Sequence, residues 1–173
     1  MANTHNLIAS NTVSGSSTSQ VAFNSISQAY TDLKIVIKAK VEGGGSNMAM
    51  RFNNSTGPYY QMVFATDGSG SGPAYSSSLT SIAYWYTATN NAAFNGPRFA
   101  INDIAINHYT GSNYKSCRIY SFQPGTEANY CGKSNTQVQW QGTDAITSIL
   151  LFNYSGANFT AGSTFHLYGI KRN

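Results

Sequence analysis

Residues 33–41, LKIVIKAKV, alternate strictly between two kinds of side chain. Successive side chains of a β-strand point to opposite faces, so this stretch predicts a half-buried strand. The inward set is Leu33, Ile35, Ile37, Ala39 and Val41, and the outward set is Lys34, Val36, Lys38 and Lys40. The outward lysines face either water alone or an acidic partner, and the two possibilities imply different functions.

The same two-residue period recurs along the chain, and no segment of twelve residues shows the 3.6-residue period of a helix. About ten short apolar stretches are separated by turns rich in Gly, Ser and Asn. This pattern predicts an all-β protein, a single antiparallel β-sandwich of jelly-roll-like form spanning residues 1–173. Residues 67–78, DGSGSGPAYSSS, are expected to form a flexible Gly/Ser loop within it.

Three local features follow from the pattern. Residues 7–9 and 21–23 flank a Ser/Thr/Gly loop, which predicts an opening hairpin. The apolar phase changes at Asn102-Asp103, which predicts a β-bulge. The expected core comprises Leu33, Ile35, Ile37, Phe52, Phe64, Ile119, Ile149, Leu151, Phe165 and Leu167.

Charge is scarce in this chain. Only 9% of residues are charged, against about 25% in an average globular protein, whereas 41% are hydrophobic and 13% aromatic, which argues against disorder. The net charge of +4 reflects few acids as much as many bases. Basic residues cluster only in the lysine row (Lys34, Lys38 and Lys40) and at Lys171-Arg172. Nucleic-acid binders carry longer basic tracts, so we expect no nucleic-acid partner.

Targeting signals are also missing. Residues 1–20 lack a basic start followed by an apolar run, and no apolar stretch approaches the length that spans a membrane. We therefore expect synthesis in a cytoplasm and no membrane partner. Cys117 and Cys131 either form a disulfide, if the chain is exported, or stay reduced as small apolar residues, which we favour.

No arrangement of reactive side chains predicts an enzyme. The six acids form no pair that the sequence places together, and His5, His108 and His166 are scattered. The chain has no GxSxG, no CxxC and no paired Cys/His spacing, and DGSGSG lacks the further carboxylates of a calcium loop. We expect no catalytic residue, no metal and no cofactor.

The triplet Tyr84-Trp85-Tyr86 is the best aromatic candidate for binding. Exposed rings stack on the faces of sugars, so a carbohydrate site is one interpretation. The other, which we favour, is that Tyr84 and Tyr86 fill the core while Trp85 covers the outer sheet or an interface.

Several segments occur in a recognisable order: LIASNTV, VAFNSISQAYTDLKIVIKA, MRFNN, a Gly/Ser loop before TSI, TDAITSILLF and NFTAGSTFHLYGI. Together they cover nearly the whole chain, which resembles a group of small tailed-bacteriophage virion proteins. Ser27 and Gln28 stand where that group commonly has a proline-containing turn. The group is structural and without agreed catalytic residues, so the resemblance implies no active site.

The resemblance implies a virion component assembled in the host cytoplasm. We expect a capsid decoration protein, because the chain is one domain without a coiled-coil shaft and ends soon after its last strand. Its expected partner is the major capsid protein or another virion protein, contacted by Lys34, Val36, Lys38 and Lys40, and we expect a homo-oligomer, a trimer. The alternatives are a small tail or fibre protein, or a receptor module that binds host glycan through Tyr84, Trp85 and Tyr86.

Overall fold

The computed structural model describes residues 5–15, 18–42, 47–66, 74–80, 83–86, 98–124 and 131–171, without the side chains of 66, 74–80, 84–86 and 131. These parts contain twelve strands and no helix. The strands are β1 (His5–Thr12), β2 (Gln20–Phe23), β3 (Asp32–Ala39), β4 (Asn47–Phe52), β5 (Tyr59–Thr66), β6 (Ala74–Thr80), β7 (Ala83–Tyr86), β8 (Ala100–Asn107), β9 (Lys115–Pro124), β10 (Cys131–Trp140), β11 (Ile149–Asn153) and β12 (Thr164–Ile170). Within the described parts, no helix is long and apolar enough to cross a membrane.

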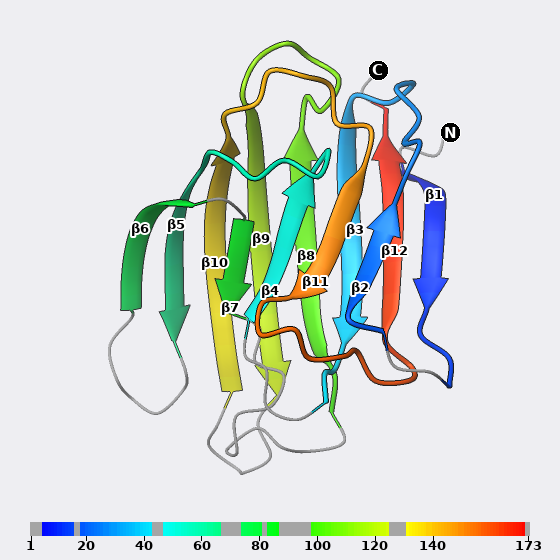
Figure 1. Cartoon of the computed structure of the whole chain (residues 1–173), viewed down its shortest axis with the longest axis vertical. Helices are drawn as coiled ribbons and strands as arrows, with labels where there is room; N and C mark the ends of the chain where they lie inside the picture. Colours follow the sequence, from blue (N-terminus) through cyan, green and yellow to red (C-terminus); the bar gives the residue numbers. More distant parts are fainter. Residues whose placement is uncertain are drawn as a thin grey trace.

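The strands form two antiparallel sheets that pack face to face. The large sheet has the order β1-β12-β3-β8-β9-β10-β5-β6, and the small sheet has the order β2-β11-β4-β7. Figure 1 shows the small sheet in front of the middle of the large sheet, and β1 and β6 form the two edges of the large sheet. The predicted antiparallel β-sandwich is confirmed.

The chain crosses repeatedly between the sheets. It runs from β2 in the small sheet to β3 in the large one, back to β4, on to β5 and β6, and back again to β7. β11 later returns to the small sheet between β2 and β4. Strands distant in sequence thereby become neighbours, as in a jelly roll, and the hairpin-connected strands β8, β9 and β10 widen the large sheet.

The predicted opening hairpin is wrong. β1 pairs with β12 at the edge of the large sheet, and β2 pairs with β11 at the edge of the small sheet. The link between them therefore passes from one sheet to the other. Val13, which lies in this link, is buried; its N–H donates to the carbonyl of Ser163, and its carbonyl accepts from the N–H of Gly162. Burial of Val13 and pairing with the C-terminal strand therefore override a local turn.

The core lies between the sheets and matches the prediction at nine of ten positions. Leu33, Ile35, Ile37, Phe52, Ile119, Ile149, Leu151, Phe165 and Leu167 are all fully buried. Phe64 is the exception, since 37% of it is exposed. β5 turns Tyr59, Gln61 and Val63 inward instead, where the ring of Tyr59 stacks on that of Trp140.

The predicted bulge at Asn102-Asp103 is also wrong. β8 keeps a continuous register with both β3 and β9 across these residues. Asn102 points inward in phase with Ile104, while Ile101 points outward and is exposed. The change of apolar phase therefore reflects a buried amide and an exposed isoleucine, and the register shift of this sheet lies in β1, between Leu7 and Ala9.

The predicted Gly/Ser loop at residues 67–78 is wrong for residues 74–78. Residues 74–78 belong to β6, which pairs with β5 from Ala65↔Ala74 to Tyr59↔Thr80. Pairing of this serine-rich segment with residues 59–65 of β5 explains the difference, and residues 67–73 lie outside the described parts.

Candidate binding face

Exposed apolar side chains gather on the outer face of the large sheet, the side turned away from the small sheet. Six large ones on β5, β8 and β9 are exposed by 37–53%. We call this set the outer apolar face: Tyr60, Met62, Phe64, Ile101, Tyr120 and Phe122. Alternation explains it, because each strand turns its other side chains into the core.

The strand register brings these residues together although their strands are distant in sequence. Ile101 lies opposite Phe122 across β8 and β9. Tyr120 lies opposite Asn135 of β10, which in turn lies opposite Phe64 of β5. Directly opposite residues in antiparallel strands share a face, so the two apolar groups flank a single polar strand.

That polar strand carries an amide pair. The Gln137 side chain donates a hydrogen bond of 2.9 Å from Nε2 to Oδ1 of Asn135. Gln137 itself lies between Arg118 and Met62 in the register. The two amides therefore partly satisfy each other, and rings and aliphatic groups border them on both sides.

The lysine row lies beside this face on β3, and its charges are not equivalent. Lys34 pairs with Asp103 of β8, with 2.7 Å between Nζ and Oδ2. Lys38 is exposed, with its Nζ 4.6 Å from the centre of the Phe99 ring. Val36 is half-buried between His166 and Asp103 in the register. Lys40 lies just beyond the strand.

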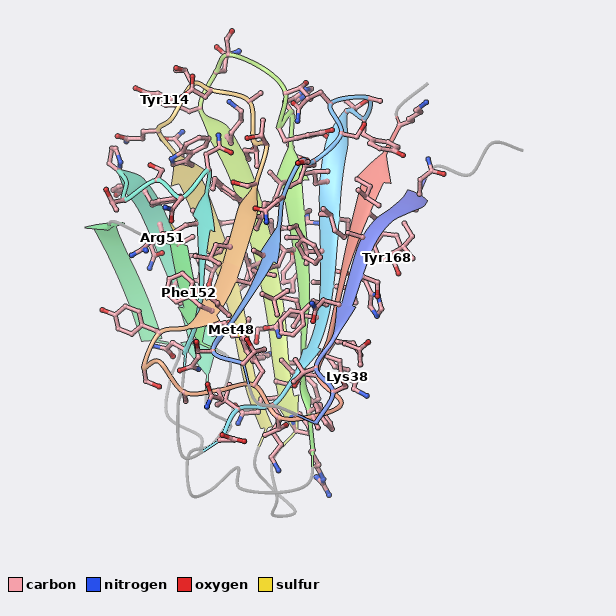
Figure 2. The ribbon with its side chains drawn as sticks, turned by 45° about the vertical axis from the view of Figure 1, so that its right-hand side comes forward. Lys38, Met48, Arg51, Tyr114, Phe152 and Tyr168 are labelled. Carbon is pink, nitrogen blue, oxygen red and sulfur yellow. The ribbon has the colours of Figure 1, made fainter. Side chains whose placement is uncertain are left out.

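Among the described residues, the outer side of the large sheet is mainly apolar and carries more positive than negative side chains. Arg118 lies 4.9 Å from the Tyr120 ring centre, and Lys133 lies opposite Phe122. Asp103 lies among these cations, and its charge is offset by Lys34. Figure 2 labels Lys38 and Tyr168 on this side of the molecule.

The aromatic triplet lies in β7, at the edge of the small sheet. Its backbone pairs with β4, with Met48 opposite Trp85, and Ala49 opposite Tyr84. The side chains of Tyr84, Trp85 and Tyr86 lie outside the described parts, so both interpretations of the triplet stay predictions.

One serine–histidine pair was not anticipated from the sequence. Ser10 of β1 and His166 of β12 lie side by side, with 3.0 Å between Oγ and Nδ1. A nucleophile of this kind needs a carboxylate to orient its histidine, yet the nearby acid Asp103 is bonded to Lys34. Alternation alone could have shown that His166 faces outward, but the pairing with Ser10 depends on the N- and C-terminal strands meeting.

Other reactive groups in the described parts are held in the structure. No three His, Cys, Asp or Glu side chains there come together as a metal site. Lys115 is buried and donates hydrogen bonds to the carbonyls of Asn113 and Thr143, and burial lowers its pKa. Cys117 is buried among apolar residues, which raises the pKa of its thiol.

Comparison of the chain with protein-family models, with curated proteins and with solved structures finds no match. The resemblance to bacteriophage virion proteins therefore stays a prediction.

Proposed function

We propose that this chain is a non-enzymatic structural protein of a bacteriophage virion, attached as a decoration protein to the outside of the head through the outer apolar face. The observation that carries the proposal is the concentration of six large exposed apolar side chains on one side of one sheet. Large exposed apolar patches that are bordered by polar residues mark interaction sites. The order of sequence segments described above supports the virion as the setting.

The area of this face suits a stable contact. Four strands about 4.8 Å apart, each with three outward residues, cover about 400 Å². All eight strands of the large sheet together cover about 800 Å², which is the area that one partner contributes to a standard interface. Burying the central apolar part, at about 25 cal/mol per Å², supplies the main driving force.

The charges on this side favour an acidic partner over a second copy of the chain. Lys38, Arg118 and Lys133 surround the apolar centre, and Asp103 is already offset by Lys34. Two copies placed face to face would bring like charges together, which costs affinity. A capsid exterior is often acidic and fits these cations. The contacts of a trimer would then lie elsewhere, and the trimer itself stays a prediction.

A cryo-EM map of the particle tests this proposal. We expect density for the sandwich on the outside of the head, with the large sheet toward the shell and the small sheet toward solvent. Density in the tail or a fibre would replace decoration by the tail-protein alternative. Purified particles that lack the chain altogether would contradict the virion assignment.

A further inference from the structure

An open pocket lies on the outer side of the small sheet, on the opposite side of the sandwich from the outer apolar face. It encloses about 140 Å³ where β2, β4 and β11 meet. Gln20, Arg51, Leu150 and Phe152 line it together with Ser19 and the turn after β11. Its volume suits a single small ring rather than a protein segment.

Arg51 gives the pocket a positive charge. Its guanidinium carbon lies 5.3 Å from the centre of the Phe152 ring, and Figure 2 shows these two residues next to each other. Arg51 Nε is buried and has no hydrogen-bond partner. Because the protein itself covers Nε, a ligand in the pocket meets the guanidinium at its two Nη groups. The ion pair of Lys34 and Asp103 lies on the other sheet, away from Arg51.

The pocket wall is fixed by internal hydrogen bonds. The Asn153 amide donates to the carbonyl of Asn47 and accepts from both the N–H and the hydroxyl of Ser155. Gly156 has a φ of +80°, and a Cβ built there would meet nothing within 4 Å. The turn therefore holds its shape while its rim stays open to a ligand.

We propose that this pocket binds a sugar that carries a carboxylate, such as a uronic acid unit of an acidic polysaccharide. The planar guanidinium of Arg51 lines the pocket, and its two Nη groups form a fork that matches a carboxylate. Phe152 and Leu150 provide an apolar surface for the sugar ring, and Ser19 and Gln20 carry polar groups for its hydroxyls. This inference does not depend on the proposed attachment, although a chain docked by its large sheet would expose the pocket to solvent.

Titration of the ¹⁵N-labelled full chain by NMR tests the site. We expect D-glucuronate to shift the backbone signals of Gln20, Arg51 and Phe152 with a millimolar dissociation constant, the range of a ligand of this size. D-glucose, acetate and inorganic phosphate should each bind at least about tenfold more weakly, because each lacks either the carboxylate or the ring.

Three variants distinguish a built site from general attraction to a basic protein. Arg51→Gln should weaken glucuronate binding by about tenfold or more, and Arg51→Lys should restore part of it, because lysine keeps the charge but not the fork. Arg118→Gln removes an equal charge from the other sheet and should leave binding unchanged. A thermal melt of each variant separates loss of binding from loss of fold.

Several results would overturn the inference. Equal binding of glucose would remove the role of the carboxylate, and equal binding of acetate or phosphate would reduce the pocket to a simple anion site. An equal loss in Arg118→Gln would show unspecific attraction. Signals that stay unshifted in excess glucuronate would rule the site out.

Discussion

Lys34 of β3 and Asp103 of β8 form an ion pair across neighbouring strands, with 2.7 Å between Nζ and Oδ2. Asp103 lies opposite Val36 in the register, so the contact to Lys34 is diagonal. The ion pair has no net charge, so Lys34, one of the three lysines of the row, does not attract a distant acidic partner. Steering by this side of the molecule therefore depends on Lys38, Arg118 and Lys133 more than on the row as a whole.

Replacing Asp103 by Asn should speed association with an acidic surface, because it releases the charge of Lys34. We expect a gain of a few-fold in the association rate with undecorated particles at low salt, and none at high salt, where the Debye length falls to about 3 Å. Stopped-flow or surface binding across a salt series measures it.

The double variant Lys34→Gln, Asp103→Asn is the control, since it removes the pair without changing net charge. It should associate at the wild-type rate. The side chains are 31% and 43% exposed, so the pair contributes about 0–1 kcal/mol to stability and the melting temperature should barely change. An unchanged rate in Asp103→Asn at low salt would show that this side does not steer binding.

Asn53 holds the turn after β4 to the segment before β11. Its Oδ1 accepts hydrogen bonds from Thr147 N at 2.8 Å and Ser148 N at 3.1 Å, and its Nδ2 donates to Ala145 O at 2.8 Å. Asn53→Ala should lower the free energy of unfolding by about 4 kcal/mol, since each of the three bonds contributes about 1 kcal/mol and alanine in the left-handed conformation of residue 53 costs about 1 kcal/mol more.

Asn54 provides a matched control because it has nearly the same backbone, with φ of 53° against 51° at Asn53, and is exposed. Asn54→Ala should cost only about 1 kcal/mol, the price of a left-handed alanine. Urea unfolding of both variants measures the difference. Equal losses would mean that the side-chain bonds of Asn53 are unimportant.

The raised pKa of Tyr59 predicts that the folded protein becomes less stable at alkaline pH. Burial raises its pKa from the ordinary 10.0 to about 12, although its hydroxyl accepts a hydrogen bond from Phe52 N. Between these values the unfolded chain loses the proton and the folded chain keeps it, so stability falls as pH rises from 10 to 12. At pH 11 this single group should contribute a loss of about 1.4 kcal/mol.

Tyr59→Phe removes the titrating group and should reduce the loss between pH 8 and pH 11 by that amount, whatever its effect at pH 8. Urea unfolding at the two pH values measures it. The buried thiol of Cys117, whose pKa is also raised, adds an alkaline loss of its own that is common to both proteins. An identical pH dependence in wild type and variant would contradict the account of Tyr59.

The two cysteines should be insensitive to reductant. Cys117 lies opposite Val138, whereas Cys131 lies opposite Pro124, seven residues further along β9. At about 3.3 Å per residue the two Cα atoms are about 23 Å apart, well beyond the reach of a disulfide. We expect the same melting temperature with and without reductant, and two thiols by mass after alkylation. A drop in melting temperature on reduction would indicate a bond between chains.

Alternation along the sequence predicted which residues share a face, but not always which face is buried. In β3 the two faces differ strongly, one apolar and one rich in lysine, and the prediction was correct. In β5 both faces are apolar, and Tyr59 with Val63 competes with Tyr60 and Phe64. The packing of Tyr59 against Trp140 decides the outcome, and this contact joins strands far apart in the sequence.

The pairing partner of each strand could likewise not be predicted from local sequence patterns. The predicted hairpin of β1 and β2 was wrong because β1 pairs with β12 at the far end of the chain. The outer apolar face was missed for the same reason. It depends on the order β8-β9-β10-β5, which brings Ile101, Phe122 and Phe64 to one surface. The aromatic positions themselves were visible, but their outward direction was not.

The attachment surface is the central claim, and a matched pair of tyrosine variants tests it most directly. Tyr120 on the outer apolar face and Tyr114 in the loop before β9 are 45% and 55% exposed, so both can be replaced by serine without opening the core. Figure 2 labels Tyr114 at the top end of the molecule, away from the sheet face. Truncating a central aromatic of an interface commonly costs 2 kcal/mol or more, about thirtyfold in affinity.

The measurement is the dissociation constant of each variant for undecorated phage particles at physiological salt. We predict that Tyr120→Ser weakens binding by about thirtyfold or more, that Phe64→Ser with Phe122→Ser weakens it further, and that Tyr114→Ser binds like wild type. Equal binding by all four proteins would show that the outer apolar face is not the attachment surface, and no binding by wild type would contradict decoration itself.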